Sequence, residues 1–376
     1  MQATSIHLQW LEPGLDRRFR TGVSLHSHTL HSLESLDFIY QAARYSSILR
    51  WALRKGEARY LKLNGEALDL RRGWWTPPLG AREAHEVESS QITSFGFAPI
   101  ISLTDHDDIE APMSLQAMDA SLNVPVSVEW TVPYRATFFH VGVHNLAPRG
   151  ARGMMRRFRN FTARPEEWDL AAILDELHAD AGTLIVLNHP FWDEQGVGAP
   201  VHNAALLDFL TAHRQWIHAI EINGLRPWEE NRESLRLAKD WSKPAVAGGD
   251  RHALEPNAVL NLTSAAGMQE FVAEVRAGLS RVLITPRYRE PYRVRILHNI
   301  LDVFRTYADH GRGWTEWSDR VFYTLPGGAV ESLTQIWGPR PPTAVNIFAG
   351  IMRFAGQPPV RQALRAALPQ REEVAP

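Results

Sequence analysis

Histidine and carboxylate side chains recur along this chain at the ends of short apolar segments. The positions that follow or lie within these segments are His26, His28, Asp105, His106, Glu129, His140, His189, Glu221, Asp250 and His252. Imidazole nitrogens and carboxylate oxygens are the donors that bind divalent transition metals such as zinc, manganese and iron. Each short motif is a weak signal by itself. If so many ionisable groups were buried together without cations, they would strongly destabilise the fold. The pattern therefore predicts a metal site.

The apolar segments that carry these residues are short and rich in β-branched side chains, which predicts β-strands. They are residues 22–25, 99–103, 124–128, 136–143, 183–187, 219–222 and 245–247. Helical spacing over 168–179 and 229–241 indicates crossover helices and a mainly parallel sheet. Seven such units in about 270 residues favour a closed barrel, although a doubly wound sheet also fits. In either architecture the carboxyl ends of the strands meet at one face.

Two regions depart from this alternation of strands and helices. Residues 40–97 form a long insertion after the first strand, rich in Trp, Arg and Pro, for which we expect a cap or a small hairpin element. Beyond Pro291 the alternation stops, and residues 291–376 are expected to form a helical C-terminal extension. The predicted organisation is therefore a barrel over residues 1–290 followed by this extension.

The composition of the chain limits the class of protein. Its 376 residues are 44% hydrophobic and 22% charged, which excludes a disordered or fibrous chain. There is no cysteine, so disulfides, thiolate nucleophiles and cysteine-ligated zinc are excluded. A formal net charge of −2 provides no overall positive field for a long nucleic acid. Because no apolar run is long enough to serve as a secretion signal or to span a bilayer, we expect a soluble, cytoplasmic protein.

The order of the motifs resembles that of a known superfamily. His-x-His-Thr, Thr-Asp-His, Glu, His, His-Pro and Asp-x-His follow one another as in the polymerase and histidinol phosphatase (PHP) superfamily of metal-dependent phosphoesterases, over about residues 20–290. The resemblance implies a distorted seven-stranded (β/α) barrel with up to three divalent metals at the carboxyl ends of its strands. The ligands that it implies are His26, His28, His106, Glu129, His140, His189, Asp250 and His252, and Glu34, at a position where some members carry a ligand, is taken as the ninth.

The sequence departs from the family pattern in three places. Ser24 stands two residues before the first of these histidines, where the family usually has Asp, and Ser32-Leu33-Glu34 replaces the usual Ser-Asp-Gly. Arg251 replaces a small residue between two implied ligands, and a guanidinium group there can bind a substrate phosphate. Arg251 and Asp105, which belongs to the Thr-Asp-His motif, are the predicted catalytic residues.

The resemblance implies metal-dependent hydrolysis of a phosphate ester. Nitrogen-rich ligand sets suit Mn, Zn or Fe better than Mg, and two to three ions per chain are expected. A water on such metals ionises near pH 7 and can attack phosphorus in line. The acid that protonates the leaving group is left open among Asp107, His31 and His144. The expected partner is a small phosphorylated substrate, a long nucleic acid is disfavoured, and the oligomeric state is left open.

Three other classes of protein agree less well with the sequence. A binuclear amidohydrolase bridges its metals with a modified lysine on a central strand, where none of the four lysines lies, and it is disfavoured. A TatD-like metal-dependent nuclease fits the Thr-Asp-His and Asp-x-His motifs less well. A non-catalytic metal-binding or interaction module of the same superfamily would be expected to have lost ligands, whereas eight of the nine positions are matched here and Glu34 can fill the ninth.

One basic segment follows the fourth predicted strand. Between Ala147 and Pro165 there are six arginines and no acidic residue. Because the segment starts on the same rim as His140, its guanidinium groups could gather an anionic substrate. A solvated helix face is the more common role of such a charge run and is the favoured interpretation.

Overall fold

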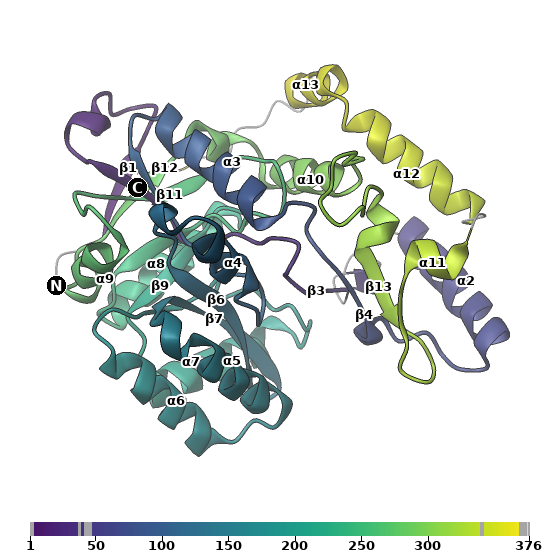
Figure 1. Cartoon of the computed structure of the whole chain (residues 1–376), viewed down its shortest axis with the longest axis horizontal. Coiled ribbons are helices and arrows are strands. Elements are labelled where there is room, and N and C mark those ends of the chain that lie inside the picture. The colour runs from purple at the N-terminus through teal and green to yellow at the C-terminus, as the bar shows by residue number, and fades with distance from the viewer. Residues whose placement is uncertain (1–3, 37–38, 41–46, 339–341, 368–373, 375–376) are drawn as a thin grey trace.

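In the computed structural model the chain is a mixed α/β fold with two five-stranded sheets at its centre (Figure 1). The structure describes residues 4–36, 39–40, 47–338, 342–367 and 374, so part of the insertion and part of the C-terminal extension lie outside it. The first sheet has the order β1 (Ser5–Leu8), β12 (Arg281–Ile284), β11 (Val259–Thr263), β2 (Thr21–Ser24) and β5 (Ala98–Ile101). β11 is antiparallel to both of its neighbours, and the other pairs are parallel.

The second sheet carries most of the strands that the sequence predicts. Its order is β10 (Ala245–Gly248), β9 (Ala219–Asn223), β8 (Leu184–Leu187), β7 (Thr137–Leu146) and β6 (Val126–Tyr134). β8, β9 and β10 are parallel, whereas β7 is antiparallel to both β6 and β8. β6 and β7 form a hairpin closed by residues 135–136, and Arg135 has the positive φ of 54° that tight hairpin turns favour.

All seven strands expected from the sequence form, but the expected closed seven-stranded barrel does not. The strands lie in two separate sheets, because β2 pairs with β5 on one side and with β11 on the other and has no edge left for β10. Isolated bridges, Ser27 with Arg251 and His106 with Glu129, link segments of the two sheets near the strand ends. The expected mainly parallel arrangement is interrupted at β6 and β7, which are antiparallel and connected by a two-residue turn.

Helices flank both sheets (Figure 1). They are α3 (Ala81–Ser94), α4 (Glu110–Met118), α5 (Pro148–Ala163), α6 (Glu167–Ala179), α7 (Ala199–His213), α8 (Trp228–Asp240) and α9 (Met268–Arg276). The helices expected over 168–179 and 229–241 are confirmed as α6 and α8. Leu170, Ile173 and Leu174 are buried along one face of α6, as their helical spacing predicts.

The largest apolar core lies against the second sheet. Trp130 of β6 stacks on Phe158 of α5, with ring centroids 4.4 Å apart, and both side chains are fully buried. A second cluster, which includes Ile92 of α3 and Leu115 of α4, packs against the first sheet. These cores fix the strands, and the polar residues that follow the strands are thereby held in place.

A side-chain amide joins the two sheets where no ladder does. Asn261 lies on β11, and its Oδ1 accepts a hydrogen bond from the Ala247 N–H of β10 at 2.8 Å. Its Nδ2 donates to the Ala247 carbonyl at 2.8 Å and lies 3.3 Å from the Val23 carbonyl oxygen of β2. Asn261 and Ala247 are each 1% exposed, so the amide supplies partners that water cannot.

Replacing Asn261 with leucine is expected to lower the free energy of unfolding by about 2–4 kcal/mol, because it leaves the buried N–H and C=O of Ala247 without these partners. Urea unfolding followed by circular dichroism measures the change. Asn160, exposed on α5, is the control, and Asn160→Leu should change stability by less than about 0.5 kcal/mol. If the two variants were equally stable, the amide would not be what joins the sheets.

A third sheet connects the insertion to the C-terminal region. Its order is β14 (Val330–Ser332), β13 (Val321–Thr324), β4 (Gly73–Trp75) and β3 (Glu34–Ser35), with all pairs antiparallel. The C-terminal extension is therefore not wholly helical as expected, since it contains this hairpin besides α10 (Tyr292–Val303), α11 (Leu333–Trp337), α12 (Thr343–Ala355) and α13 (Pro358–Ala367). Gly327 and Gly328, with φ of 95° and 90°, allow the turn between β13 and β14.

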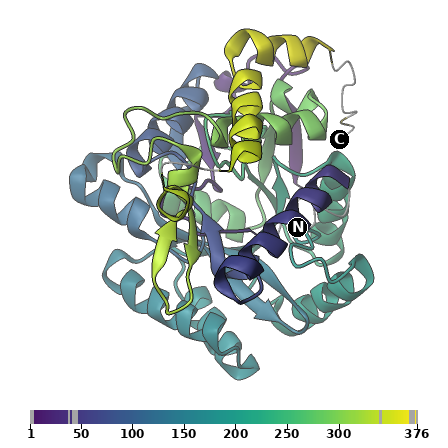
Figure 2. The ribbon, with the colours of Figure 1, turned by 90° about the vertical axis from the view of Figure 1, so that its right-hand side faces the viewer.

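The insertion contains a long helix, α2 (Ser47–Asn64), as well as β4 and α3. Figure 2 shows the end of the molecule that α2 forms together with α11, α12 and the hairpin β13–β14. Because β13 pairs with β4, residues on both sides of the predicted boundary at 290 share one sheet. None of the helices in the described part of the chain is both long and apolar enough to cross a membrane.

Candidate metal centre

Glu129, on β6, lies at the centre of a buried cluster of histidines. Its Oε2 is 2.9 Å from His26 Nε2, and its Oε1 is 3.1 Å from His189 Nε2. Three more ring nitrogens lie within 3.6 Å of these oxygens, those of His28, His106 and His140. Five of the six predicted histidine ligands thus surround one carboxylate whose exposed fraction is 0%.

Two further carboxylates face the same set of histidines. Glu34 Oε2 is 3.3 Å from His252 Nε2 and 3.4 Å from His106 Nε2. Asp250 Oδ1 is 3.5 Å from both His28 Nε2 and His252 Nδ1. All nine residues that the sequence predicts as metal ligands therefore meet at one place.

The donor atoms form overlapping groups of three, and within each group they lie within 4.8 Å of one another. The groups are His26–His28–Glu129, His28–Glu34–His106, His28–Asp250–His252, His106–Glu129–His140 and His26–His189–Glu221. Several buried carboxylate oxygens and imidazole nitrogens at this density form a donor set that fits Mn, Zn or Fe, with mixed nitrogen and oxygen ligands. The residues present therefore fit the metals that the sequence predicts.

The carboxyl ends of separate strands bring these residues together. Those that follow a strand are His26 and His28 (β2), His106 (β5), His189 (β8), and Asp250 with His252 (β10). Two of them have a positive φ, 22° at His189 and 55° at Asp250, which non-glycine residues seldom adopt. Such backbone conformations concentrate at functional sites, where surrounding structure enforces them.

Glu34 reaches the cluster because the third sheet holds it there. It pairs with Trp75 across β3 and β4, and its side chain is 9% exposed rather than solvated at a helix start. Ser32 Oγ donates to Glu34 Oε1 at 2.6 Å and accepts from the His106 N–H at 3.0 Å. The carboxylate is thus oriented towards His28, His106 and His252, while its assignment as a metal ligand stays a prediction.

Replacing Glu34 with glutamine is expected to weaken metal binding by about 10–100-fold, because the amide keeps the shape of the side chain and removes its charge. Titration calorimetry of the metal-free protein with Mn²⁺ or Zn²⁺ measures the change. Glu86, exposed on α3, provides the control variant Glu86→Gln, whose affinity should equal that of the parent. An unchanged affinity in Glu34→Gln would show that this carboxylate is not a ligand.

Glu221 belongs to the cluster although it was not among the predicted ligands. Its Oε1 is 2.6 Å from His26 Nδ1, and its Oε2 accepts from the His189 N–H at 2.8 Å. Gly248 allows this approach, since a Cβ there would overlap Glu221 Oε1. The sequence pattern includes it, as a carboxylate within the apolar run Ala219–Asn223, but the family resemblance does not imply it as a ligand. Asn188, which donates to Glu129 Oε1 at 2.9 Å, is not among the predicted site residues.

Burial and mutual interaction move the pKa values within the cluster. Burial opposes the charged form of His26, but Glu129 and Glu221 hold its pKa well above its usual value. Burial likewise opposes the charged form of Glu129, yet His26 and His106 hold the pKa of that carboxyl well below its usual value. Burial is the main cause that lowers the pKa of His28 to about 4. Without metal, some groups of the cluster therefore hold a proton more strongly than others. A metal that binds to the protonated groups must displace these protons.

Asp105 and Arg251, the predicted catalytic residues, are buried and bond to the polypeptide near the cluster. Asp105 accepts hydrogen bonds from the Thr29 backbone N–H and, at 2.7 Å, from the Thr29 hydroxyl, and burial raises its pKa to about 7. Arg251 donates to the carbonyls of Ala253 at 2.7 Å and Leu254 at 2.9 Å. Two of its donor groups thus hold its own loop, and the predicted contact of Arg251 with a substrate phosphate stays a prediction. A catalytic role of Asp105 stays a prediction.

Glu88, on α3, supplies a buried carboxylate close to Ser24, the position at which the PHP pattern usually has Asp. Its Oε2 accepts from Asn257 Nδ2 at 2.5 Å, and the same amide lies 3.1 Å from Ser24 Oγ. Its Oε1 is 3.7 Å from Arg251 Nη1. Because Arg251 stands between two predicted ligands, the ion pair helps to position the segment that carries them.

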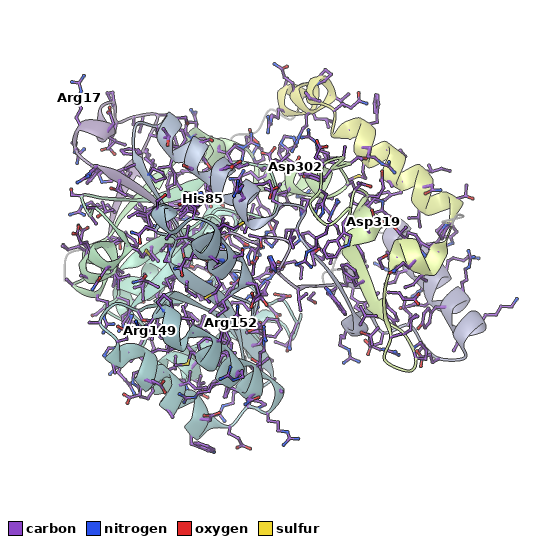
Figure 3. The ribbon with its side chains drawn as sticks, viewed as in Figure 1. Arg17, His85, Arg149, Arg152, Asp302 and Asp319 are labelled. Carbon is purple, nitrogen blue, oxygen red and sulfur yellow. The ribbon has the colours of Figure 1, made fainter. Side chains whose placement is uncertain are left out.

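The six arginines of the basic segment lie on or at the end of α5, where Figure 3 labels Arg149 and Arg152. Three of the six pair with acidic residues of other elements. In two of these pairs Arg152 Nη1 is 2.5 Å from Glu110 Oε1, and Arg159 Nη2 is 3.2 Å from Asp108 Oδ2. The pairs support the interpretation of a solvated helix face.

Comparisons with solved structures found several proteins that are similar over part of this chain. An amidohydrolase from Chromobacterium violaceum, solved with sulfate and without metal, is 17% identical over 47% of this chain and 84% of its own, with a TM-score of 0.33. A two-domain protein from Bacteroides vulgatus that contains a predicted PHP-like metal-dependent phosphoesterase is 16% identical over 50% of this chain and 58% of its own, with a TM-score of 0.34. A protein from Bifidobacterium adolescentis, named as a proposed metal-dependent phosphoesterase, is 15% identical over 53% and 92%, with a TM-score of 0.33.

No protein-family model matches the sequence, and no curated protein matches it. Proteins named as PHP-like metal-dependent phosphoesterases and as an amidohydrolase are thus among those that this chain resembles in structure. At these identities and scores the likeness adds nothing to the assignment of residues, which rests on the motifs and on the geometry of the cluster.

Proposed function

We propose that this protein hydrolyses a phosphate ester of a small substrate with two to three divalent transition metals held by the cluster around Glu129. The observation that carries the proposal is the convergence of six histidines with Glu34, Glu129 and Asp250. The order of the motifs, which resembles that of PHP phosphoesterases, supports the class of reaction. When bound, Mn, Zn or Fe would polarise phosphate oxygens and lower the pKa of a water molecule.

The chain holds the donor atoms in place before any ligand arrives. The Glu221 carboxylate fixes the His26 ring through Nδ1, which leaves Nε2 directed at Glu129. Asn188 and the backbone N–H of His189 restrain the carboxylates of Glu129 and Glu221, respectively. Such outer hydrogen bonds set the orientation and basicity of metal ligands.

Aromatic side chains border the cluster. Trp75 of β4 stacks on the His252 ring with centroids 5.8 Å apart, and Phe138 of β7 lies 5.1 Å from the ring of His140. Apolar groups at these positions limit the access of bulk water and lower the local dielectric constant, which strengthens the interaction of the cluster with an anionic phosphate.

Metal analysis and an activity screen test this function. The purified protein is expected to contain more than one transition metal per chain and, loaded with Mn²⁺, Zn²⁺ or Fe²⁺, to turn over at least one phosphate mono- or diester. A protein that takes up no metal would contradict the metal centre itself. A protein that binds metals and hydrolyses none of the esters would be a non-catalytic metal-binding module, and hydrolysis of nucleic-acid substrates alone would favour a nuclease.

A further inference from the structure

Large apolar side chains are exposed to solvent at the end of the molecule shown in Figure 2. On α12, Ile347, Ile351 and Phe354 are 61%, 59% and 62% exposed. Their spacing places all three on one face of the helix. Ala349, on the inward face, is only 1% exposed, so one face of α12 is packed against the protein and the opposite face is exposed to solvent. This outer face contains no charged residue.

The neighbouring helix at this end, α2, is strongly basic. It contains five basic residues and a single acidic one, although the chain as a whole has a formal net charge of −2. All five basic residues are exposed, namely Arg50, Arg54, Lys55, Arg59 and Lys62. Trp51 and Leu61 are 62% and 51% exposed on the same helix, and Lys55 Nζ lies 6.0 Å from the Trp51 ring.

We propose that this end, formed by α2 and α12, binds the surface of an anionic lipid bilayer. Such a surface combines negative charge at the headgroups with an apolar layer directly beneath. Basic side chains on α2 match the headgroups, while Trp51 and the apolar face of α12 can enter the layer below. Helices that lie on membranes use this combination of exposed aromatic or aliphatic residues with lysine and arginine.

Two other occupants of this end are disfavoured by the structure. Val374 packs against the largest apolar core, so this residue does not cover the end formed by α2 and α12. A second copy of the chain in a symmetric dimer would bring two basic α2 helices close together, and like charges repel. An anionic surface meets no such repulsion.

Co-sedimentation with vesicles tests the proposal on the full chain. Vesicles of phosphatidylcholine containing phosphatidylserine are expected to bind the protein at least about tenfold more tightly than phosphatidylcholine alone. Raising the salt from about 0.1 M to about 1 M, which shortens the screening length to about 3 Å, should weaken the binding. Lys55→Gln/Lys62→Gln should reduce it by about 10–30-fold. Trp51→Ser and the triple variant Ile347→Ser/Ile351→Ser/Phe354→Ser should each reduce it at least about tenfold.

Matched variants elsewhere on the surface provide the controls. Trp168 on α6 is 72% exposed and Leu207 on α7 is 52% exposed, so Trp168→Ser and Leu207→Ser remove comparable apolar area away from this end. Both should bind vesicles like the parent. The proposal is overturned if the parent does not bind the anionic vesicles, or if the controls reduce binding as much as Trp51→Ser. It is also overturned if sedimentation velocity shows a dimer that the triple variant abolishes, which would assign the face to a second copy.

Discussion

Replacing Glu129 with glutamine is expected to lower kcat/KM for the phosphate ester by more than about 100-fold, which exceeds what groups around a metal ligand contribute. The two Glu129 oxygens face five ring nitrogens, and two of the three-residue donor groups include this carboxylate. Glutamine keeps the size of the side chain but removes its charge and one acceptor oxygen, so both groups lose affinity together. Metal content by mass spectrometry and kcat/KM at saturating metal separate loss of metal from loss of catalysis.

Variants of two other carboxylates provide the comparison and the control for Glu129→Gln. Glu221→Gln, which changes the partner of His26 Nδ1, should lower kcat/KM by about 10–100-fold. Glu229→Gln, at an exposed position of α8, should leave it unchanged. If Glu129→Gln kept the metal content and the kcat/KM of the parent, the proposed centre would be rejected.

Removal of the metals is expected to lower the stability of the protein markedly. At a free metal concentration of about 1,000 times Kd, each ion that binds only the native state adds about 4 kcal/mol to the free energy of unfolding. For a cooperative unit of the 376 residues of this chain this corresponds to roughly 5 °C in Tm per ion. Differential scanning calorimetry with and without a chelator measures the difference. A Tm that does not respond to the chelator in a protein shown to contain metal would contradict the expectation.

The stabilisation by metal is expected to grow between about pH 6.5 and pH 9. In the metal-free protein burial opposes the charged form of His252, but Glu34 and Asp250 raise its pKa to about 9, whereas a histidine in an unfolded chain has a pKa of about 6.5. Protonated His252 therefore stabilises the metal-free fold fully below about pH 6.5, and this contribution is lost as the pH rises through about 9. Metals bind the neutral ring, so their affinity rises over the same range. A chelator-induced change in Tm that stays constant across this range would contradict the assignment of His252.

The strands and most of the predicted ligands could be read from the sequence because each depends on a local pattern. The apolar run that becomes β10 ends just before Asp250 and His252, and the run that becomes β2 ends just before His26 and His28. Where a strand ends at the face that carries the site, the type of the residue that follows is enough to predict a metal-binding side chain. Neither prediction needs any knowledge of which strands are neighbours.

Strand pairing could not be predicted in the same way, because it depends on contacts between distant segments. Nothing local indicates that β11 lies antiparallel beside β2 and prevents a ladder from β10, or that Asn261 supplies the missing partners. The contact between His26 and Glu221 joins residues 195 positions apart in the chain. For a related reason, the position of Arg251 between two predicted ligands does not indicate the direction of its side chain.

The third sheet determines when, during synthesis of the chain, the metal centre can be completed. A nascent chain emerges N-terminus first, and its folded units form in that order. Glu34 leaves the ribosome early, but β3 and β4 are very short, and an isolated two-stranded ribbon is only marginally stable in water. The sheet is complete only after β13 and β14 have emerged, long after Asp250 and His252. A partly synthesised chain is therefore expected to hold metals more weakly than the finished one, so that ion capture is delayed until nearly the whole polypeptide has been made.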